Sequence, residues 1–359
     1  MTRIFNFCAG PATLPLSVLE KARDELLDYR GLGMSVMEIS HRSTAFDELA
    51  GTTEACLRRL MSVPDDYAVL FLAGGATMQF AQVPWNLASA SRPGAYIVDG
   101  AWSKKAFAIA QGLGLAHLAA SSADSGFKSI PRQDEWNLDG DYAYLHYASN
   151  ETISGVQFKQ PPESTLPLVS DMSSDILSRP VDVEKFGVIY AGAQKNIGQA
   201  GIALVIVRKD LLQDLPPGIP DLQSWKIQHQ QGSRLNTPPT YAWYIAGLVF
   251  DWIEANGGVE HMARLNQVKA DTLYRYLDQS DFYRNDIPQE YRSHMNIPFQ
   301  IVDESLHPRF IQQAEVAGLS SLKGHRSVGG MRASIYNAMP IEGIEALISF
   351  MRDFESKAG

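Results

Sequence analysis

The sequence has little cysteine and no long apolar run. Its two cysteines, Cys8 and Cys56, cannot form a disulfide framework and offer no paired metal-ligand spacing. The N-terminal stretch MTRIFNFCAGP lacks a charged segment followed by an apolar one, and no stretch reaches the length of a membrane span. We therefore expect a cytoplasmic protein with reduced thiols, no resident metal and no membrane anchor.

Positive charge is also scarce. Lys and Arg number 31 against 40 Asp and Glu, which gives a formal net charge of −9. This balance argues against a general surface for nucleic acids or anionic membranes, so any anion must bind at a local site. The 359 residues, 45% apolar and 20% charged, have the composition of an ordinary globular protein with one large or two medium domains.

Short apolar strands alternate with helical segments along the first two thirds of the chain. Helices separate the predicted strands, which cover residues 67–74, 95–100, 142–149, 167–171, 187–192 and a stretch from 201. This alternation predicts an α/β fold with a mostly parallel, helix-covered sheet, whose chemistry collects where the strands end. A strand, helix, strand, helix pattern near the C-terminus indicates a smaller α/β domain. The predicted division is an N-terminal arm, 1–16, a large domain, 17–255, and a small domain, 256–359.

Three local features complete this outline. Apolar residues at helical spacing, from Leu19 to Tyr29, predict a first amphipathic helix. The helix after the strand at 67–74 is expected to be interrupted or kinked at Pro84. The stretch 213–237, rich in Pro, Gln and Ser, is predicted to be a long functional loop.

Four strand ends carry polar groups where a site would form. The backbone N–H groups of Ala76 and Thr77, in LAGGATMQF, suit a phosphate, although a plain glycine turn with a threonine cap explains them equally well. Trp102 could stack on a ligand ring or pack in the core. Asp171 could bind a cationic ligand atom or cap a helix. Lys195, in VIYAGAQKNIG, follows an apolar strand, where burial lowers the pKa of an amine and makes it nucleophilic. Taken together, these segments fit an aromatic, cationic, phosphorylated aldehyde, which is pyridoxal 5′-phosphate.

The motifs extend over essentially the whole chain. They include FNFCAGPATLP, GMSVMEISHRS, HYASNETISGVQF, SDMSSDILSRPVDV, GVIYAGAQKNIGQAGIALVIVR, NTPPTYAWYIAGLVFDWIEANGG and LKGHRSVGGMRASIYNAM. With these segments the sequence resembles the phosphoserine aminotransferase family, a group of fold-type I, class V pyridoxal phosphate enzymes. The resemblance implies a seven-stranded, mostly parallel sheet in the large domain.

The resemblance also implies a cofactor site and a homodimer. Lys195 would bond to the cofactor aldehyde, Asp171 would pair with its ring nitrogen, and Thr152 would touch its phenolic oxygen. The implied cofactor-binding residues are Ala76, Thr77, Trp102, Thr152, Asp171, Gln194 and Lys195, with Asn236 and Thr237 supplied by the neighbouring subunit.

The implied reaction is reversible transamination between L-glutamate and 3-phosphohydroxypyruvate, which gives 2-oxoglutarate and O-phospho-L-serine for serine biosynthesis. Relatives also use 4-phosphooxy-L-threonine, a compound of pyridoxine biosynthesis. Arg332 matches the family residue for the substrate α-carboxylate, while His41 and Arg42, with His325 and Arg326, match those for the distal anion. Arginine suits both groups because its planar fork binds carboxylate and phosphate.

Two departures and three alternatives remain at this stage. Thr77 replaces an arginine of many relatives, and Ala9 replaces a serine of some; we expect both to tune affinity without changing the reaction type. An alanine–glyoxylate-type transaminase of class V would not need the double His-Arg site. A cysteine desulfurase would need a mobile thiol, whereas Cys8 lies in the arm and Cys56 in a predicted helix. A nucleotide-binding regulatory protein would use the glycine turn and carry no lysine adduct.

Overall fold

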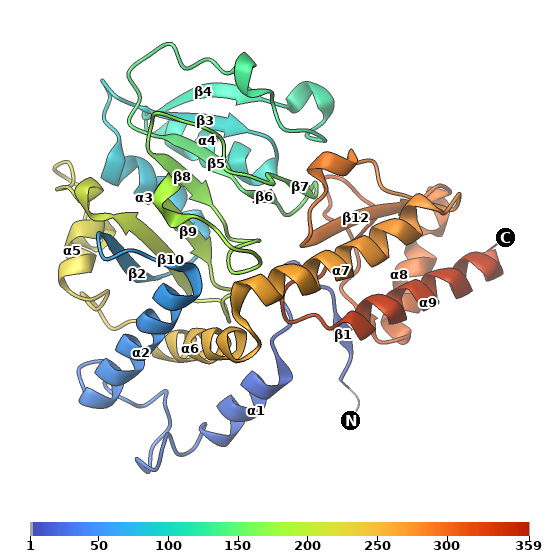
Figure 1. Cartoon of the computed structure of the whole chain (residues 1–359), viewed down its shortest axis with the longest axis horizontal. Helices are drawn as coiled ribbons and strands as arrows, with labels where there is room; N and C mark the ends of the chain where they lie inside the picture. The colour runs from blue at the N-terminus through green and yellow to red at the C-terminus, as the bar shows by residue number, and fades with distance from the viewer. Residues whose placement is uncertain (1–2, 359) are drawn as a thin grey trace.

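The structure is a computed structural model that describes residues 3–358, and its centre is a seven-stranded sheet in the order β2-β10-β9-β8-β5-β3-β4 (Figure 1). Its strands are β2 (Tyr67–Ala73), β3 (Gly94–Val98), β4 (Ala116–Ser121), β5 (Leu145–Ala148), β8 (Leu168–Asp171), β9 (Phe186–Gly192) and β10 (Ile202–Arg208). Strand β10 runs antiparallel to β2 and β9, and the other pairings are parallel. The predicted fold class is therefore confirmed.

Helices cover both faces of this sheet, as the alternation of side chains along β2 shows. Val69 and Phe71 pack in a core with α2 and α6, whereas Leu70 and Leu72 pack in a second layer with α3 and α4. Successive side chains of a strand point to opposite faces, so a strand buried on both sides is apolar throughout. The covering helices are α2 (Thr44–Met61), α3 (Ala76–Leu87), α4 (Ala101–Gly112) and α6 (Thr240–Ala255).

A separate core lies toward the C-terminus (Figure 1). It is built from β11 (Tyr283–Arg284), β12 (Asn296–Ile301), β14 (Met331–Ser334), α8 (His307–Val316) and α9 (Ile341–Ala358), together with a pair formed by β1 (Phe5–Asn6) and β13 (Leu319–Ser320). Helix α7 (Gly258–Asp278) joins the two parts, since its Met262 packs in the large core and its Leu273 in the smaller one. The domain boundary at residue 256 stays a prediction.

Several local predictions needed correction. Helix α1 (Leu16–Asp24) is shorter than predicted, and Leu19 on its expected apolar face is 37% exposed. Helix α3 continues through Pro84, so the expected interruption was wrong, while a kink at Pro84 stays a prediction. The stretch 213–237 is not all loop, because it contains α5 (Trp225–Gln230), whose Trp225 is buried against the sheet. Strand β4 and helix α2 were not predicted.

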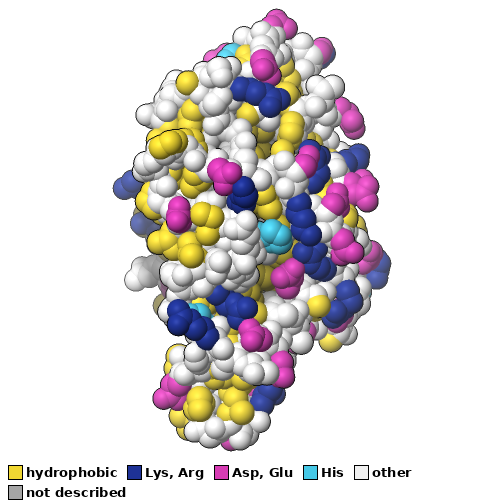
Figure 2. Space-filling view, turned by 90° about the vertical axis from the view of Figure 1, so that its left-hand side faces the viewer, with side chains coloured by type: hydrophobic (Ala, Val, Ile, Leu, Met, Phe, Trp, Pro, Cys, Tyr) yellow, Lys and Arg dark blue, Asp and Glu magenta, His cyan; other side chains and the backbone are white. Residues whose placement is uncertain are grey.

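The surface carries both signs of charge. Figure 2 shows Lys and Arg side chains interspersed with Asp and Glu on the face that it displays, with apolar patches between them. Mixed charge of this kind forms no extended positive face there. Within residues 3–358, none of the helices combines the length and the apolar character needed to cross a membrane.

Candidate active site

One cavity lies where the strands of the large sheet end, and it collects seven of the predicted site residues. These are Ala76, Thr77, Trp102, Thr152, Asp171, Gln194 and Lys195. The sequence analysis missed the remaining lining residues, which are Gly75, Phe80, Asn150, Ser173 and Ser174. The chain brings these residues together because β2, β3, β8 and β9 are parallel, so that their C-terminal ends share one edge of the sheet.

Lys195 lines the cavity and lies three residues after the end of β9. Its side chain is buried, and its Nζ donates to Oγ1 of Thr152 at 2.7 Å. Burial lowers the pKa of Lys195 to about 8, while the negative charges of Asp171 and Glu151 oppose that shift. A lysine with a lowered pKa holds a useful fraction of neutral amine near neutral pH, and neutral amine is the form that attacks a carbonyl.

Asp171 ends β8 and presents a half-satisfied carboxylate. Its Oδ1 accepts from the backbone N of Ser173 at 2.9 Å and from the Ser173 hydroxyl at 2.5 Å. No donor reaches Oδ2 in the described part of the chain, and burial raises the pKa of Asp171. A cation placed against Oδ2 would offset the cost of burying this charge, so the carboxylate suits a protonated ring nitrogen.

The N-terminus of α3 lines the cavity and provides an anion site. The helix begins after Gly75, which has no side chain to cap the first N–H groups. The preceding Gly74 has φ +112°, a conformation that favours glycine and turns the chain into the helix. The free N–H groups of Ala76 and Thr77 and the positive end of the helix dipole therefore suit a phosphate.

Trp102 forms one wall of the cavity, from the first turn of α4. The ring centroid lies 5.9 Å from Nζ of Lys195, so the indole and the amine face the same space. The indole Nε1 is buried without a partner among residues 3–358. An indole face at this position suits stacking on a planar ligand ring.

Arg332 lies beside this cavity, on β14 of the smaller part of the protein. Its Nη1 donates to the carbonyl of Thr152 at 3.3 Å, and its buried Nε has no partner in the described chain. Nearby, the hydroxyl of Tyr336 donates to the carbonyl of Ala9 at 2.7 Å. Because Ala9 contributes its main chain, this contact does not depend on the serine that some relatives carry.

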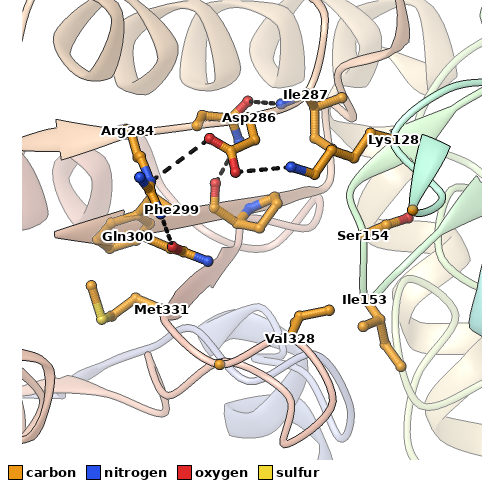
Figure 3. Close-up of a pocket in the computed structure, with 14 residues that line it drawn as sticks. Lys128, Ile153, Ser154, Arg284, Asp286, Ile287, Phe299, Gln300, Val328 and Met331 are labelled. Carbon is orange, nitrogen blue, oxygen red and sulfur yellow. Dashed lines mark hydrogen bonds and ion pairs between the residues drawn. The ribbon is translucent and has the colours of Figure 1, made fainter. Parts of the chain in front are cut away.

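His325 and Arg326 do not line the cavity. Both are exposed in the loop between β13 and β14, where Nδ1 of His325 lies 2.7 Å from the hydroxyl of Ser327. Further along the same loop, Val328 lines a neighbouring pocket together with Ile153, whose side chain lies beside it (Figure 3). Since Ile153 follows Thr152, the loop is separated from the first cavity by one segment of chain.

The last four predicted residues also lie outside the cavity, but they are close to one another. Arg234 Nη1 donates to the carbonyl of His41 at 3.2 Å, which joins the segment of His41 and Arg42 to that of Asn236 and Thr237. Arg42, Asn236 and Thr237 are exposed, and Asn236 lines a different pocket. The chain therefore presents these two segments together at its surface and not at its own lysine.

Neither cysteine lines the cavity in the described part of the chain. Cys56 is buried in α2, and burial raises the pKa of its thiol to about 12. Cys8 is half-buried, with Sγ accepting from the backbone N of Gly10 at 3.5 Å. A buried thiol is unreactive, which disfavours the desulfurase alternative.

Comparison with known proteins gives a consistent result. The family described as aminotransferase class-V matches residues 4–347. Phosphoserine aminotransferase of Pseudomonas paraeruginosa is 54% identical over 358 residues, 99% of each chain, and that of Acinetobacter baylyi is 53% identical over 99% of this chain and 100% of the relative.

Solved structures agree with the sequence relatives. Phosphoserine aminotransferase from Bacillus circulans subsp. alkalophilus superposes with a TM-score of 0.97 at 45% identity, over 99% of each chain. The enzyme from Trichomonas vaginalis, described as bound to pyridoxal phosphate, gives a TM-score of 0.93 at 41% identity, over 98% of this chain and 100% of that one. An alanine–glyoxylate aminotransferase from Nostoc, at 16% identity and TM-score 0.75, shares the fold. The chain therefore belongs to the class-V aminotransferase family, within its group of phosphoserine aminotransferases.

Proposed function

We propose that the protein is a pyridoxal phosphate-dependent phosphoserine aminotransferase. It exchanges an amino group between L-glutamate and 3-phosphohydroxypyruvate, which gives 2-oxoglutarate and O-phospho-L-serine. The observation that carries this proposal is the meeting of a buried lysine, a half-satisfied carboxylate, an indole face and an uncapped helix N-terminus in one cavity. The relatives of about 53% identity support the same substrates.

The residues present fit the cofactor. Asp171 keeps one oxygen free for the ring nitrogen, and the uncapped N–H groups of Ala76 and Thr77 fit the phosphate. Trp102 would cover the ring, and Thr152 and Gln194 would hold its polar substituents. When bound, pyridoxal phosphate supplies an aldehyde that carries the amino group and a ring that accepts an electron pair.

The protein's own residues supply the proton transfers and the orientation. Nζ of Lys195 would bond covalently to the cofactor aldehyde and, when free, would act as the base that takes the proton from Cα of the substrate. Thr152 holds Nζ in place at 2.7 Å. Arg332 would bind the α-carboxylate through its planar fork, which positions Cα beside Lys195.

Two His-Arg pairs are proposed to bind the distal phosphate of the substrate. Replacing Arg42 or His325 with alanine is expected to weaken O-phospho-L-serine binding by about 10- to 100-fold, because each removes one charge-assisted contact. Pyridoxal phosphate affinity should change by less than about twofold, since neither residue lines the cavity. Titration of the cofactor absorbance with each ligand measures both constants. The control is Arg264→Ala, which removes an exposed arginine of α7. If Arg42→Ala or His325→Ala weakened the binding of the cofactor as much as that of O-phospho-L-serine, the assignment of these residues to the substrate phosphate would be contradicted.

A homodimer is proposed because the residues that should complete the cofactor site lie elsewhere on their own chain. Arg234 donates to the carbonyl of His41 and lies two residues before Asn236, so we propose that both segments enter the site of the partner subunit. Exposed apolar side chains in the same region, such as Leu32 at 47% and Met37 at 54%, provide surface for such a contact. The partner would then supply both a phosphate-binding edge and a His-Arg pair.

Mixed dimers test this arrangement. Lys195→Ala and Asn236→Ala/Thr237→Ala subunits are each expected to be nearly inactive alone. A hybrid contains one site with an intact lysine and an intact neighbouring segment, so random mixing should restore about a quarter of native activity. Activity measured after co-refolding the two variants decides the point. If Asn236 and Thr237 served their own chain, mixing would restore nothing.

Two further proposals concern a second substrate and the location of the protein. 4-Phosphooxy-L-threonine carries the same α-carboxylate and distal phosphate, so we propose it as a second substrate. A cytoplasmic location is also proposed, and the two free cysteines are consistent with a reducing compartment. No partner beyond these small molecules and a second copy of the chain is proposed.

A further inference from the structure

Two buried carboxyl groups lie next to the active site without lining its cavity. Asp99 follows β3, and Glu151 belongs to β6 (Asn150–Glu151), which pairs with β7 (Val156–Gln157) in a short hairpin. Both side chains are 0% exposed. Burying two acidic groups together is costly unless at least one of them is neutral or well hydrogen-bonded, so this pair requires an explanation.

The Glu151 carboxylate is well satisfied. It accepts from the backbone N of Trp102 at 3.0 Å and from the backbone N and hydroxyl of Ser103, each at 2.7 Å. These donors belong to the first turn of α4, whose preceding Gly100 has no side chain to cap it. A carboxylate at a helix N-terminus is stabilised by the N–H groups and by the helix dipole, so Glu151 is suited to be ionised.

The carboxyl group of Asp99 differs from that of Glu151 because, among the described residues, it is not hydrogen-bonded. Neither of its carboxyl oxygens has a hydrogen-bond partner within residues 3–358. Burial and the neighbouring charge of Glu151 raise its pKa well above the usual value. Two adjacent carboxyl groups titrate as a pair, and the proton stays on the group with fewer donors. Burial also raises the pKa of Glu151, but the hydrogen bonds from Ser103 and Trp102 oppose that shift, so Asp99 is the member of the pair that is suited to keep the proton.

Glu151 connects three parts of the site. It holds the main chain of Trp102, whose indole lines the cavity, and its neighbour Thr152 contacts Lys195. The charged groups that act on Lys195 are Asp171, Glu151 and Asp175, which raise its pKa, and Arg332, which lowers it. The packing is close, because a Cβ placed on Gly100 would lie 2.2 Å from Cδ of Glu151.

We infer that Glu151 is a positioning residue of the active site: its ionised carboxylate fixes Trp102 and Thr152 relative to Lys195 and acts electrostatically on the lysine, while Asp99 remains protonated beside it. The inference concerns the bare protein, and it relies on the proposed function only for the choice of pyridoxal phosphate as the probe.

The test measures how fast cofactor-free protein bonds covalently to added pyridoxal phosphate at different pH values. Samples are trapped with borohydride, and the adduct on Lys195 is quantified by mass spectrometry. The rate should rise with pH and reach half of its maximum near pH 8, because only the neutral amine reacts. Asp99→Asn should keep this midpoint, since it replaces a group that is already neutral.

Adding Glu151→Gln to Asp99→Asn should then move the midpoint down by about one unit, because a negative charge that favours the ammonium form is lost. A purely structural role for Glu151 would lower the rate at every pH and leave the midpoint in place, which would overturn the inference. A shifted midpoint in Asp99→Asn alone would overturn the assignment of the proton. If the wild type formed no adduct at all, the proposed function would fail instead.

Two glycine-to-alanine variants, which change only steric contacts, keep the inference testable if the double variant does not fold. Gly100→Ala keeps every charge but pushes the Glu151 carboxylate away from α4. Gly112→Ala changes the same helix where a Cβ meets nothing within 4 Å. The first should weaken pyridoxal phosphate binding at least tenfold, and the second should leave it unchanged. Native affinity in Gly100→Ala would contradict the positioning role.

Discussion

Lys195→Ala is expected to abolish covalent attachment of pyridoxal phosphate and to lower the transamination rate by more than about 10³-fold. The loss follows from two roles of one atom, because Nζ forms the covalent bond and also moves the Cα proton. In the structure this amine is buried and lines the cavity, held by Thr152 at 2.7 Å. No second lysine lines the cavity among residues 3–358.

Two measurements check this result. Borohydride reduction followed by mass spectrometry counts cofactor adducts, and a coupled assay follows 2-oxoglutarate. The matched control is Lys104→Ala, which removes an exposed lysine from the first turn of α4. That variant should keep one adduct per chain and native turnover. An adduct in Lys195→Ala, or turnover within tenfold of the wild type, would refute the assignment of the lysine.

The sequence predicted the central sheet well because its strands are buried on both faces. Strands β2 and β9 are continuous apolar runs, and such runs identify doubly covered strands. Strand β4 was missed because it lies at the sheet edge and is only partly buried, with residues such as Leu118 43% exposed. Its small and polar residues carry no clear period. Helix α1 was predicted too long because apolar spacing continues past Asp24, where the helix ends.

The site was predictable where each residue follows its own strand. Asp171 is the last residue of β8 and Lys195 lies three residues after the end of β9, so the parallel pairing of these strands brings them together. Contacts between distant segments could not be derived in this way. The contact between Trp102 and Glu151 spans 49 positions and depends on how the β6–β7 hairpin folds back onto α4. The contact between Arg234 and the carbonyl of His41 spans 193 positions, and no marked sequence pattern surrounds that arginine.

Asp171→Asn is expected to separate cofactor attachment from catalysis. The carboxylate would keep the ring nitrogen protonated, so its loss should slow transamination by about 10³-fold, or roughly 4 kcal/mol in the barrier. Covalent attachment of the cofactor should not be slowed, since Asp171 has the largest effect among the charges that raise the pKa of Lys195. Without it that pKa falls, more of the amine is neutral below pH 8, and the adduct should form at lower pH than in the wild type.

Measuring both attachment and turnover of Asp171→Asn distinguishes an electrostatic role of Asp171 from general damage to the site. A distorted cavity would slow attachment and turnover together, whereas loss of the charge should slow turnover alone. Ser173→Ala is the graded control, because it removes the hydroxyl donor to Oδ1 at 2.5 Å but keeps the carboxylate and the backbone donor. That variant should lose about tenfold or less in turnover. Turnover of Asp171→Asn within tenfold of the wild type would show that the ring nitrogen does not depend on this carboxylate, and the free Oδ2 would then need another explanation.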